Sequence, residues 1–141
     1  MCEGDILLYM KLIYTYLLSL PIIFAFDMLW LGVFAKDYYA RLMSPVVEIK
    51  FYWPAVIAFY LLYIVGIFIF SIYPGVLEKN LTKTLVYAAL FGFFCYMTYD
   101  ITNLATVKNW PLGLVFVDIL WGVVLSTFTS FVAYKIYFWI Q

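Results

Sequence analysis

Residues 85–134 read LVYAALFGFFCYMTYDITNLATVKNWPLGLVFVDILWGVVLSTFTSFVAY, and this stretch decides the fold. Two long apolar runs flank the polar residues Lys108 and Asn109. A helix needs about 20 mainly apolar residues to cross the hydrocarbon core of a bilayer, and each run is long enough. Because the connection between the runs is short, we expect two transmembrane helices that form an antiparallel hairpin.

Two further apolar runs of spanning length precede this hairpin. We therefore predict an all-α integral membrane protein, a bundle of four transmembrane helices over residues 12–34, 54–73, 85–107 and 111–134. An even number of crossings places both termini on one side of the membrane. Nothing is left over for a soluble domain, so we expect residues 1–141 to form a single membrane domain. The connection over residues 35–53 mixes charged and apolar residues, and we expect a partly interfacial loop with a short amphipathic turn.

The composition supports a membrane protein and excludes several functions. The chain is 68% hydrophobic and 11% charged, whereas soluble domains are about half apolar and a quarter charged. The bilayer is therefore an expected partner, and the zero formal net charge argues against nucleic acid. The sequence has no histidine, and its two cysteines, Cys2 and Cys95, form no CxxC motif. We accordingly expect no metal site and no cofactor.

The same dipeptide begins two of the predicted helices, as Trp53-Pro54 and Trp110-Pro111. Proline suits a first helical turn, where its missing N–H would have no partner. Tryptophan suits the headgroup level, so we interpret the two pairs as matched anchors at one face of the membrane. Lysine and arginine divide equally between the two sides, so their distribution predicts no orientation.

Three acidic residues lie inside the predicted spans: Asp27, Asp100 and Asp118. A charged side chain at the centre of a membrane helix costs about 2.5–3.5 kcal/mol on insertion scales. With a rise of about 1.5 Å per residue, all three lie at a similar distance from the midplane, on the side of the Trp-Pro pairs. Three helices that place a carboxyl at one depth predict a polar layer in the interior of the bundle.

Other polar groups gather at the same depth. Tyr96, Asp100 and Asn103 follow at i, i+4 and i+7, so they share one helix face. In the first and fourth spans a tryptophan follows the aspartate by three residues, in the pairs Asp27–Trp30 and Asp118–Trp121. An indole N–H can donate a hydrogen bond to a carboxyl on a neighbouring helix. These seven residues form our candidate layer for a ligand, a proton or a cation.

No lysine or arginine lies in the hydrocarbon beside these carboxyls, so we expect at least one of them to be neutral at pH 7. Two interpretations remain open. Buried aspartates can act only as hydrogen-bonding links between helices, or they can line a functional polar pocket. We favour the pocket, because three carboxyls are more than four helices need for cohesion.

Small residues recur along the two helices of the hairpin. Gly122, Ser126 and Ser130 follow one another at intervals of four, and Ala88 and Gly92 do the same on the preceding helix. Such stripes let membrane helices approach closely, so we assign them to packing and not to chemistry.

The sequence resembles a family of small predicted membrane proteins that is known as domain of unknown function twenty-one seventy-seven. The resemblance rests on five motifs in order, and it covers nearly the whole chain. These motifs are Asp27-x-x-Trp30-Leu31-Gly32, Trp53-Pro54-Ala55, Thr98-Tyr99-Asp100-x-Thr102-Asn103-Leu104-Ala105, Trp110-Pro111-Leu112 and Asp118-x-x-Trp121-Gly122. The family implies a similar length and four helices, and it brings no established activity, substrate or cofactor.

Three functions fit these features. The first is a small binding or transport protein that holds an amphipathic ligand, a proton or a cation at the aspartate layer. The second is a structural or assembly subunit, either of a homo-oligomer or of a larger membrane complex. The third is a membrane enzyme that acts on a lipid-like substrate with paired carboxyls as acid and base. We favour binding or transport over an enzyme, because the sequence offers no histidine, metal motif or nucleophile dyad.

Overall fold

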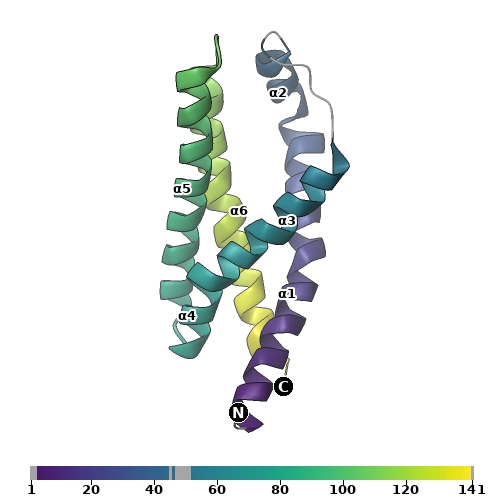
Figure 1. Ribbon diagram of the computed structural model, residues 1–141, viewed down its shortest axis with the longest axis vertical. Helices are drawn as coiled ribbons and strands as arrows, with labels where there is room; N and C mark the ends of the chain where they lie inside the picture. Colours follow the sequence, from purple (N-terminus) through teal and green to yellow (C-terminus); the bar gives the residue numbers. More distant parts are fainter. Residues whose placement is uncertain (1–2, 45, 47–51, 141) are drawn as a thin grey trace.

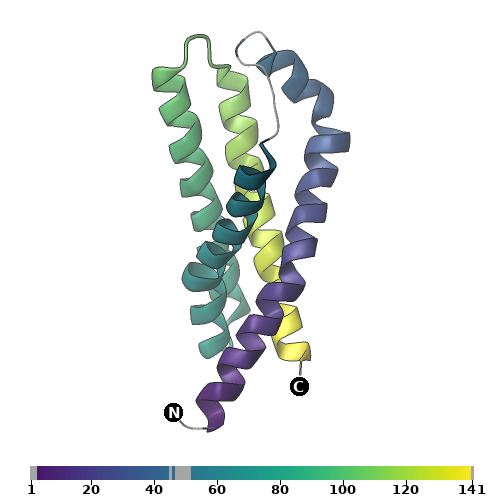
Figure 2. The same ribbon diagram turned by 45° about the vertical axis from the view of Figure 1, so that its right-hand side comes forward.

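The computed structural model describes residues 3–44, 46 and 52–140. Within these residues the elements are α-helices and two short π-helical segments, labelled η. In chain order they are α1 (Glu3–Leu29), η1 (Trp30–Phe34), α2 (Lys36–Met43), α3 (Trp53–Ile67), η2 (Phe68–Ile72), α4 (Tyr73–Leu77), α5 (Leu81–Thr106) and α6 (Leu112–Trp139). Figures 1 and 2 show long helices that run along the molecule, with both chain ends at one end of the bundle.

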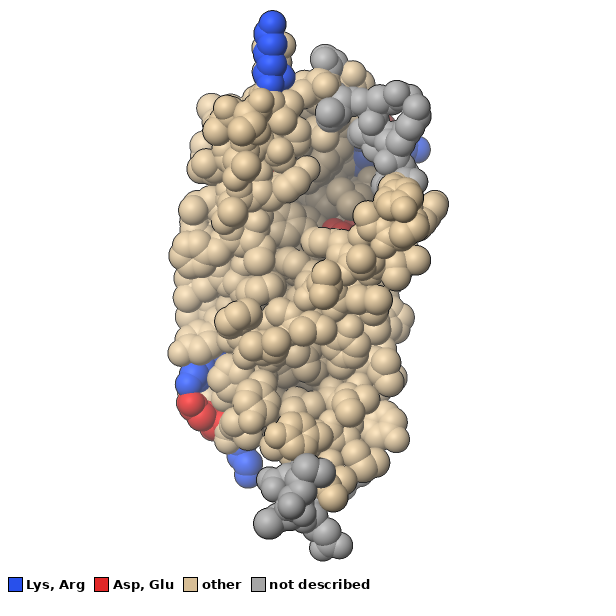
Figure 3. Space-filling view, viewed as in Figure 1, with Lys and Arg blue, Asp and Glu red and all other residues tan. Residues whose placement is uncertain are grey.

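The four predicted spans are confirmed, and each is longer than predicted. Helices that are long and apolar enough to cross a membrane cover Ile6–Phe34, Trp53–Leu77, Leu81–Thr106 and Leu112–Trp139. Hydropathy detects only the part of a helix that lies in hydrocarbon, whereas these helices continue beyond it. Many large apolar side chains on the four spans are exposed, as expected for surfaces that face lipid. Figure 3 shows charged atoms mainly toward the two ends of the molecule.

Helices α5 and α6 form the predicted antiparallel hairpin, and small residues set how closely they approach. A Cβ atom on Gly92 would lie 2.1 Å from the backbone oxygen of Gly122, and one on Gly122 would lie 2.3 Å from the Tyr96 ring. Ala88, Ser126 and Ser130 of the same stripes have 0% exposure. The packing role assigned to these residues is therefore confirmed.

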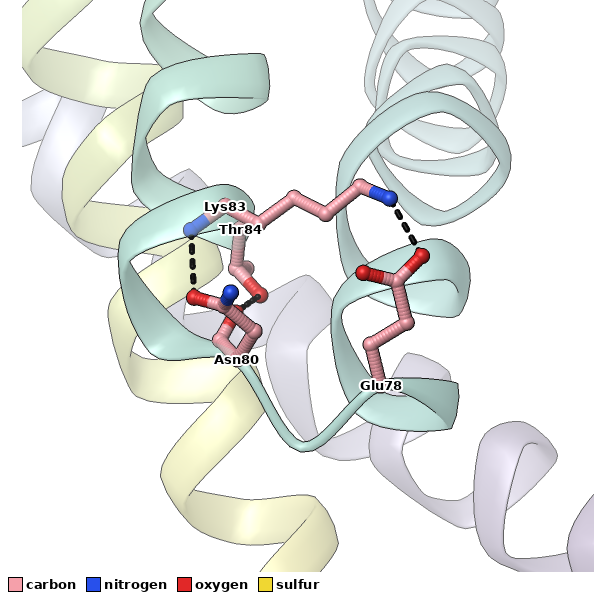
Figure 4. A network of polar contacts seen from close by, with 4 residues as sticks. All are labelled: Glu78, Asn80, Lys83 and Thr84. Atoms are coloured by element: carbon pink, nitrogen blue, oxygen red, sulfur yellow. Dashed lines mark hydrogen bonds and ion pairs between the residues drawn. The ribbon is translucent and has the colours of Figure 1, made fainter.

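A polar cluster fixes the turn between α4 and α5 at the end of the molecule that carries the termini (Figure 4). The Asn80 side chain accepts a hydrogen bond from the backbone N–H of Lys83 at 2.9 Å, and Lys83 pairs with Glu78. The Thr84 hydroxyl donates to the backbone oxygen of Asn80 at 3.0 Å. Asparagine is a favoured N-cap because its side chain satisfies a free N–H of the first turn. This turn therefore starts α5 at a defined residue.

The opposite end carries the short helix α2, in the connection that was expected to contain an amphipathic turn. Apolar side chains of α2 pack with a small buried cluster of Trp110, Leu114 and Val115. Trp110 is only 7% exposed, whereas Trp53 is 58% exposed. The interpretation of the two tryptophans as matched headgroup anchors is therefore wrong for Trp110, because α2 folds over the hairpin turn and covers it. Residues 45 and 47–51 of this connection lie outside the described residues.

Candidate functional site

Asp27 connects three helices. Its carboxyl on α1 accepts a hydrogen bond from the Tyr60 hydroxyl of α3 at 2.6 Å, and another from the Trp121 indole of α6 at 2.7 Å. The side chain is 3% exposed. Each carboxyl oxygen thus has one donor from a different helix, so this residue is both a structural link and a polar centre.

Asp118 of α6 is 8% exposed and accepts a hydrogen bond from the Tyr39 hydroxyl of α2 at its Oδ1 atom. Its Oδ2 atom has no hydrogen-bond partner among the described residues. Burial, and then the hydrogen bond to Asp118 and the charge of that carboxyl, raise the pKa of the Tyr39 phenol. Tyr39 therefore keeps its proton at neutral pH and acts as the donor.

Asp100 is buried differently from the other two aspartates. It is 0% exposed, and neither of its carboxyl oxygens has a hydrogen-bond partner among the described residues. The same holds for the side-chain nitrogens of Asn103 and Trp110. The Trp110 indole lies close to Asp100. Asp100 is thus fully buried near Trp110 of the hairpin turn, and several polar atoms around it form no hydrogen bond with the described residues.

Two of the three aspartates line one cavity, which we call the aspartate cavity. It has a volume of about 400 Å³ and is lined by Asp27, Met28, Leu31, Tyr39, Ala55, Val56, Phe59, Tyr60, Tyr96, Asp118 and Trp121. Toward the end that carries α2, Figure 3 shows a hollow in the side of the molecule with acidic atoms at its floor. The lining thus combines two carboxyls with an apolar and aromatic wall.

A second cavity adjoins the first, and we call it the aromatic groove. It has a volume of about 320 Å³ and is lined by Phe59, Tyr63, Cys95, Tyr96 and Tyr99 of α3 and α5. Phe59 and Tyr96 line both cavities. The hydroxyl of Tyr96 forms no hydrogen bond with the described residues. The cavity that contains the two carboxyls and the aromatic groove therefore share the Tyr96 side chain.

Only part of the predicted layer of seven residues lines the aspartate cavity. Trp30 stacks on Trp121, with ring centroids 4.4 Å apart and an interplanar angle of 8°. Trp30, Asp100 and Asn103 do not line the aspartate cavity, whereas the other four predicted residues do. Among the described residues, no three His, Cys, Asp or Glu side chains are grouped so that they could hold a metal ion.

Tyr39 and Tyr60, the phenols that donate to the two cavity carboxyls, were not predicted from the sequence. Tyrosines are common in membrane proteins as packing and headgroup residues, so these two could not be distinguished from the other tyrosines of the chain. Tyr60 lies at the depth of Asp27, and the depth argument that grouped the aspartates would have included it. Tyr39 comes from α2, outside the spans, where depth is no guide.

These features define a class: a small polytopic membrane protein with four helical spans and a cavity at one end of the bundle. The chain belongs to the family described as predicted membrane protein (DUF2177), which matches residues 12–135. The resemblance in the sequence motifs is thus confirmed. No curated protein and no solved structure matches the chain.

Proposed function

We propose that this protein binds a small amphipathic ligand in the aspartate cavity and the aromatic groove. The observation that carries the proposal is that the two spaces are adjacent and share the lining residues Phe59 and Tyr96. One space offers the buried carboxyls of Asp27 and Asp118, and the other offers aromatic rings. Ligand sites are typically concave and mainly apolar, with a few polar groups that fix orientation. A molecule with a polar head and an apolar tail matches both spaces together.

The position of the hollow supports entry of the ligand from the bilayer. The hollow in Figure 3 lies on the side of the bundle and not at its tip. Large apolar side chains on α3 and α5, such as Leu62 and Phe94, are exposed and would face lipid tails. A ligand dissolved in the membrane would then reach the carboxyls without crossing water. Transport would require a second opening in addition, whereas binding requires only the space described.

The main alternative is a structural subunit, in which the aspartates only hold helices together. Asp27 suits that role, since both of its oxygens have donors on other helices. Asp118 suits it less well, because its Oδ2 atom lacks a partner within the described part of the chain and its side chain lines a cavity. This difference favours a ligand site.

The test is a photoaffinity experiment with a dodecyl-chain alcohol that carries a diazirine on its tail. We expect saturable labelling of residues in the aromatic groove when the protein is held in maltoside micelles. Ala55→Trp, which fills the aspartate cavity, should reduce this labelling. Ala58→Trp, on an exposed part of the same helix, should leave it unchanged. Labelling that is spread evenly over the lipid-facing residues and is equal in both variants would exclude the proposed site.

A further inference from the structure

We infer that the ligand carries a cationic head group, an alkylammonium, that is bound between Asp118 and the aromatic side chains of the aspartate cavity. This inference rests on the proposed function and specifies its ligand. The two cavities are lined by fourteen different residues, among which carboxyls, phenols and aromatic rings recur, and none of these residues is lysine or arginine. An anionic head group would therefore meet two carboxyls and no basic side chain in this lining.

Asp118 supplies the first argument. Its side chain is 8% exposed and lines the cavity, and its Oδ2 atom has no partner among the described residues. A buried carboxylate without a nearby cation is costly, whereas pairing with a cation and hydrogen bonding offset much of that cost. An ammonium group that enters the cavity would supply both the missing charge and, if it has an N–H, the missing hydrogen bond.

The aromatic lining supplies the second argument. Phe59, Tyr60, Tyr96 and Trp121 all line the same cavity as Asp118. Aromatic faces attract cations, and aromatic cages are a common means of binding quaternary ammonium groups. The Tyr96 hydroxyl, which has no hydrogen bond to the described residues, can in addition accept an N–H. A cation at this place would thus lie beside a carboxylate and among aromatic side chains.

The groove determines where the tail lies. Phe59 and Tyr96 line both the groove and the cavity, and Tyr63, Cys95 and Tyr99 line the groove alone. The Tyr63 hydroxyl is already paired with Ser126 at 2.7 Å, which leaves its ring as the available surface. An alkyl chain placed there would extend from the head group toward the lipid-facing side of α3 and α5.

The test uses radiolabelled dodecyltrimethylammonium and the intact protein in dodecyl maltoside. Unlabelled competitors have the same chain and differ in the head: dodecylamine, dodecanol and dodecanoate. Lysophosphatidylcholine forms a further arm, because it places the ammonium group on a phospholipid head. We expect saturable binding, with dodecanol and dodecanoate competing at least about tenfold less well than the amine, a difference of about 1.4 kcal/mol. Stronger competition by lysophosphatidylcholine than by dodecylamine would indicate a membrane lipid as the source of the ammonium group. Stronger competition by dodecylamine would indicate a free amphiphilic amine.

Variants provide the second half of the test. Asp118→Asn removes the charge with little change of shape and should weaken binding by about tenfold or more. Asp37→Asn is the matched control, since Asp37 is an exposed residue of α2. If Asp118→Asn does not fold, Tyr96→Phe should still weaken dodecylamine more than dodecyltrimethylammonium, because only the amine has an N–H to donate.

The outcomes separate this inference from the proposed function. If all head groups compete equally and Ala55→Trp weakens all of them, the cavity binds amphiphiles and the cationic head group is excluded. If the labelled ammonium shows no saturable binding while the diazirine alcohol still labels the groove saturably, the inference alone is wrong. If neither probe binds saturably, or if Ala55→Trp behaves as Ala58→Trp does with both probes, the inference and the proposed function are both wrong.

Discussion

At the scale of single residues, the three aspartates differ in the partners they have. Asp27 has two donors, Asp118 has one donor and one free oxygen, and Asp100 has no hydrogen-bond partner among the described residues. An isolated ionised carboxylate in an apolar interior is so costly that it usually takes up a proton instead. Of the three aspartates, Asp100 therefore best matches the prediction that at least one carboxyl is neutral at pH 7.

The difference between Asp27 and Asp100 gives a prediction about stability. Asp27→Ala should lower the free energy of unfolding by about 1–3 kcal/mol, because the Tyr60 hydroxyl and the Trp121 indole lose their acceptor. Asp27→Asn should cost less, since its amide can still accept from Trp121 and donate to Tyr60. Asp100→Asn should leave stability nearly unchanged, as expected if Asp100 is neutral. The measurement is thermal unfolding of each variant in detergent.

An infrared spectrum provides an independent check of the protonation. A neutral carboxyl has a C=O stretching band that an ionised one lacks, and Asp100→Asn should remove such a band at pH 7. If the band is absent in the unsubstituted protein and Asp100→Asn is as destabilising as Asp27→Ala, Asp100 is an anion that requires a cationic partner.

At the scale of the elements, helices α5 and α6 of the hairpin pack closely against each other. Gly92 and Gly122 bring the two backbones together, and Tyr96 lies directly against Gly122. The position of Tyr96 at the junction of the cavity and the groove thus depends on a glycine of the opposite helix. A change in the packing of the hairpin would therefore move Tyr96 and alter the shape of the cavity and the groove.

A methyl group at Gly92 tests this connection. Gly92→Ala places a Cβ 2.1 Å from the Gly122 oxygen, so the helices must move apart, at a cost of about 1–3 kcal/mol. Gly32→Ala is the control, because no other atom lies within 4 Å of the corresponding Cβ. Thermal unfolding should show a lower unfolding temperature for Gly92→Ala and little change for Gly32→Ala. Equal behaviour of the two would mean that the hairpin is not closely packed at Gly92.

At the scale of the whole molecule, the sequence predicted what depends on bilayer thickness and little of what depends on lateral packing. The four spans and the shared depth of the aspartates follow from counting apolar residues. The hydrogen bond from Trp121 to Asp27 joins two residues of the predicted layer. The separation of Asp100 from the cavity and the burial of Trp110 depend on how helices rotate and on where α2 folds back, which depth alone does not determine.

The arrangement of the spans predicts the accessibility of both chain ends. Single cysteines introduced by Asp5→Cys and Gln141→Cys, in a background that lacks Cys2 and Cys95, should react with an impermeant thiol reagent from the same side of a sealed vesicle. Lys108→Cys, in the turn between α5 and α6, should react only from the other side. Labelling of residues 5 and 141 from opposite sides would contradict four crossings.

The π-helical segment η2 has a consequence for how this chain tolerates changes of length. A π turn contains one residue more than the α-helical turn it replaces, and such turns occur mostly as single insertions in α-helices. Deleting one residue from Phe68–Ile72 would therefore restore a regular α-helical turn and leave the residues beyond it on nearly the same faces, because the wider turn already contains the extra residue. Gly75 would then still face Thr84, where a Cβ would lie 1.7 Å from the hydroxyl oxygen. In an evolving lineage, a one-residue deletion here should therefore be tolerated, whereas a deletion within the regular helix Trp53–Ile67 would rotate the following residues by about 100° and separate Gly75 from Thr84.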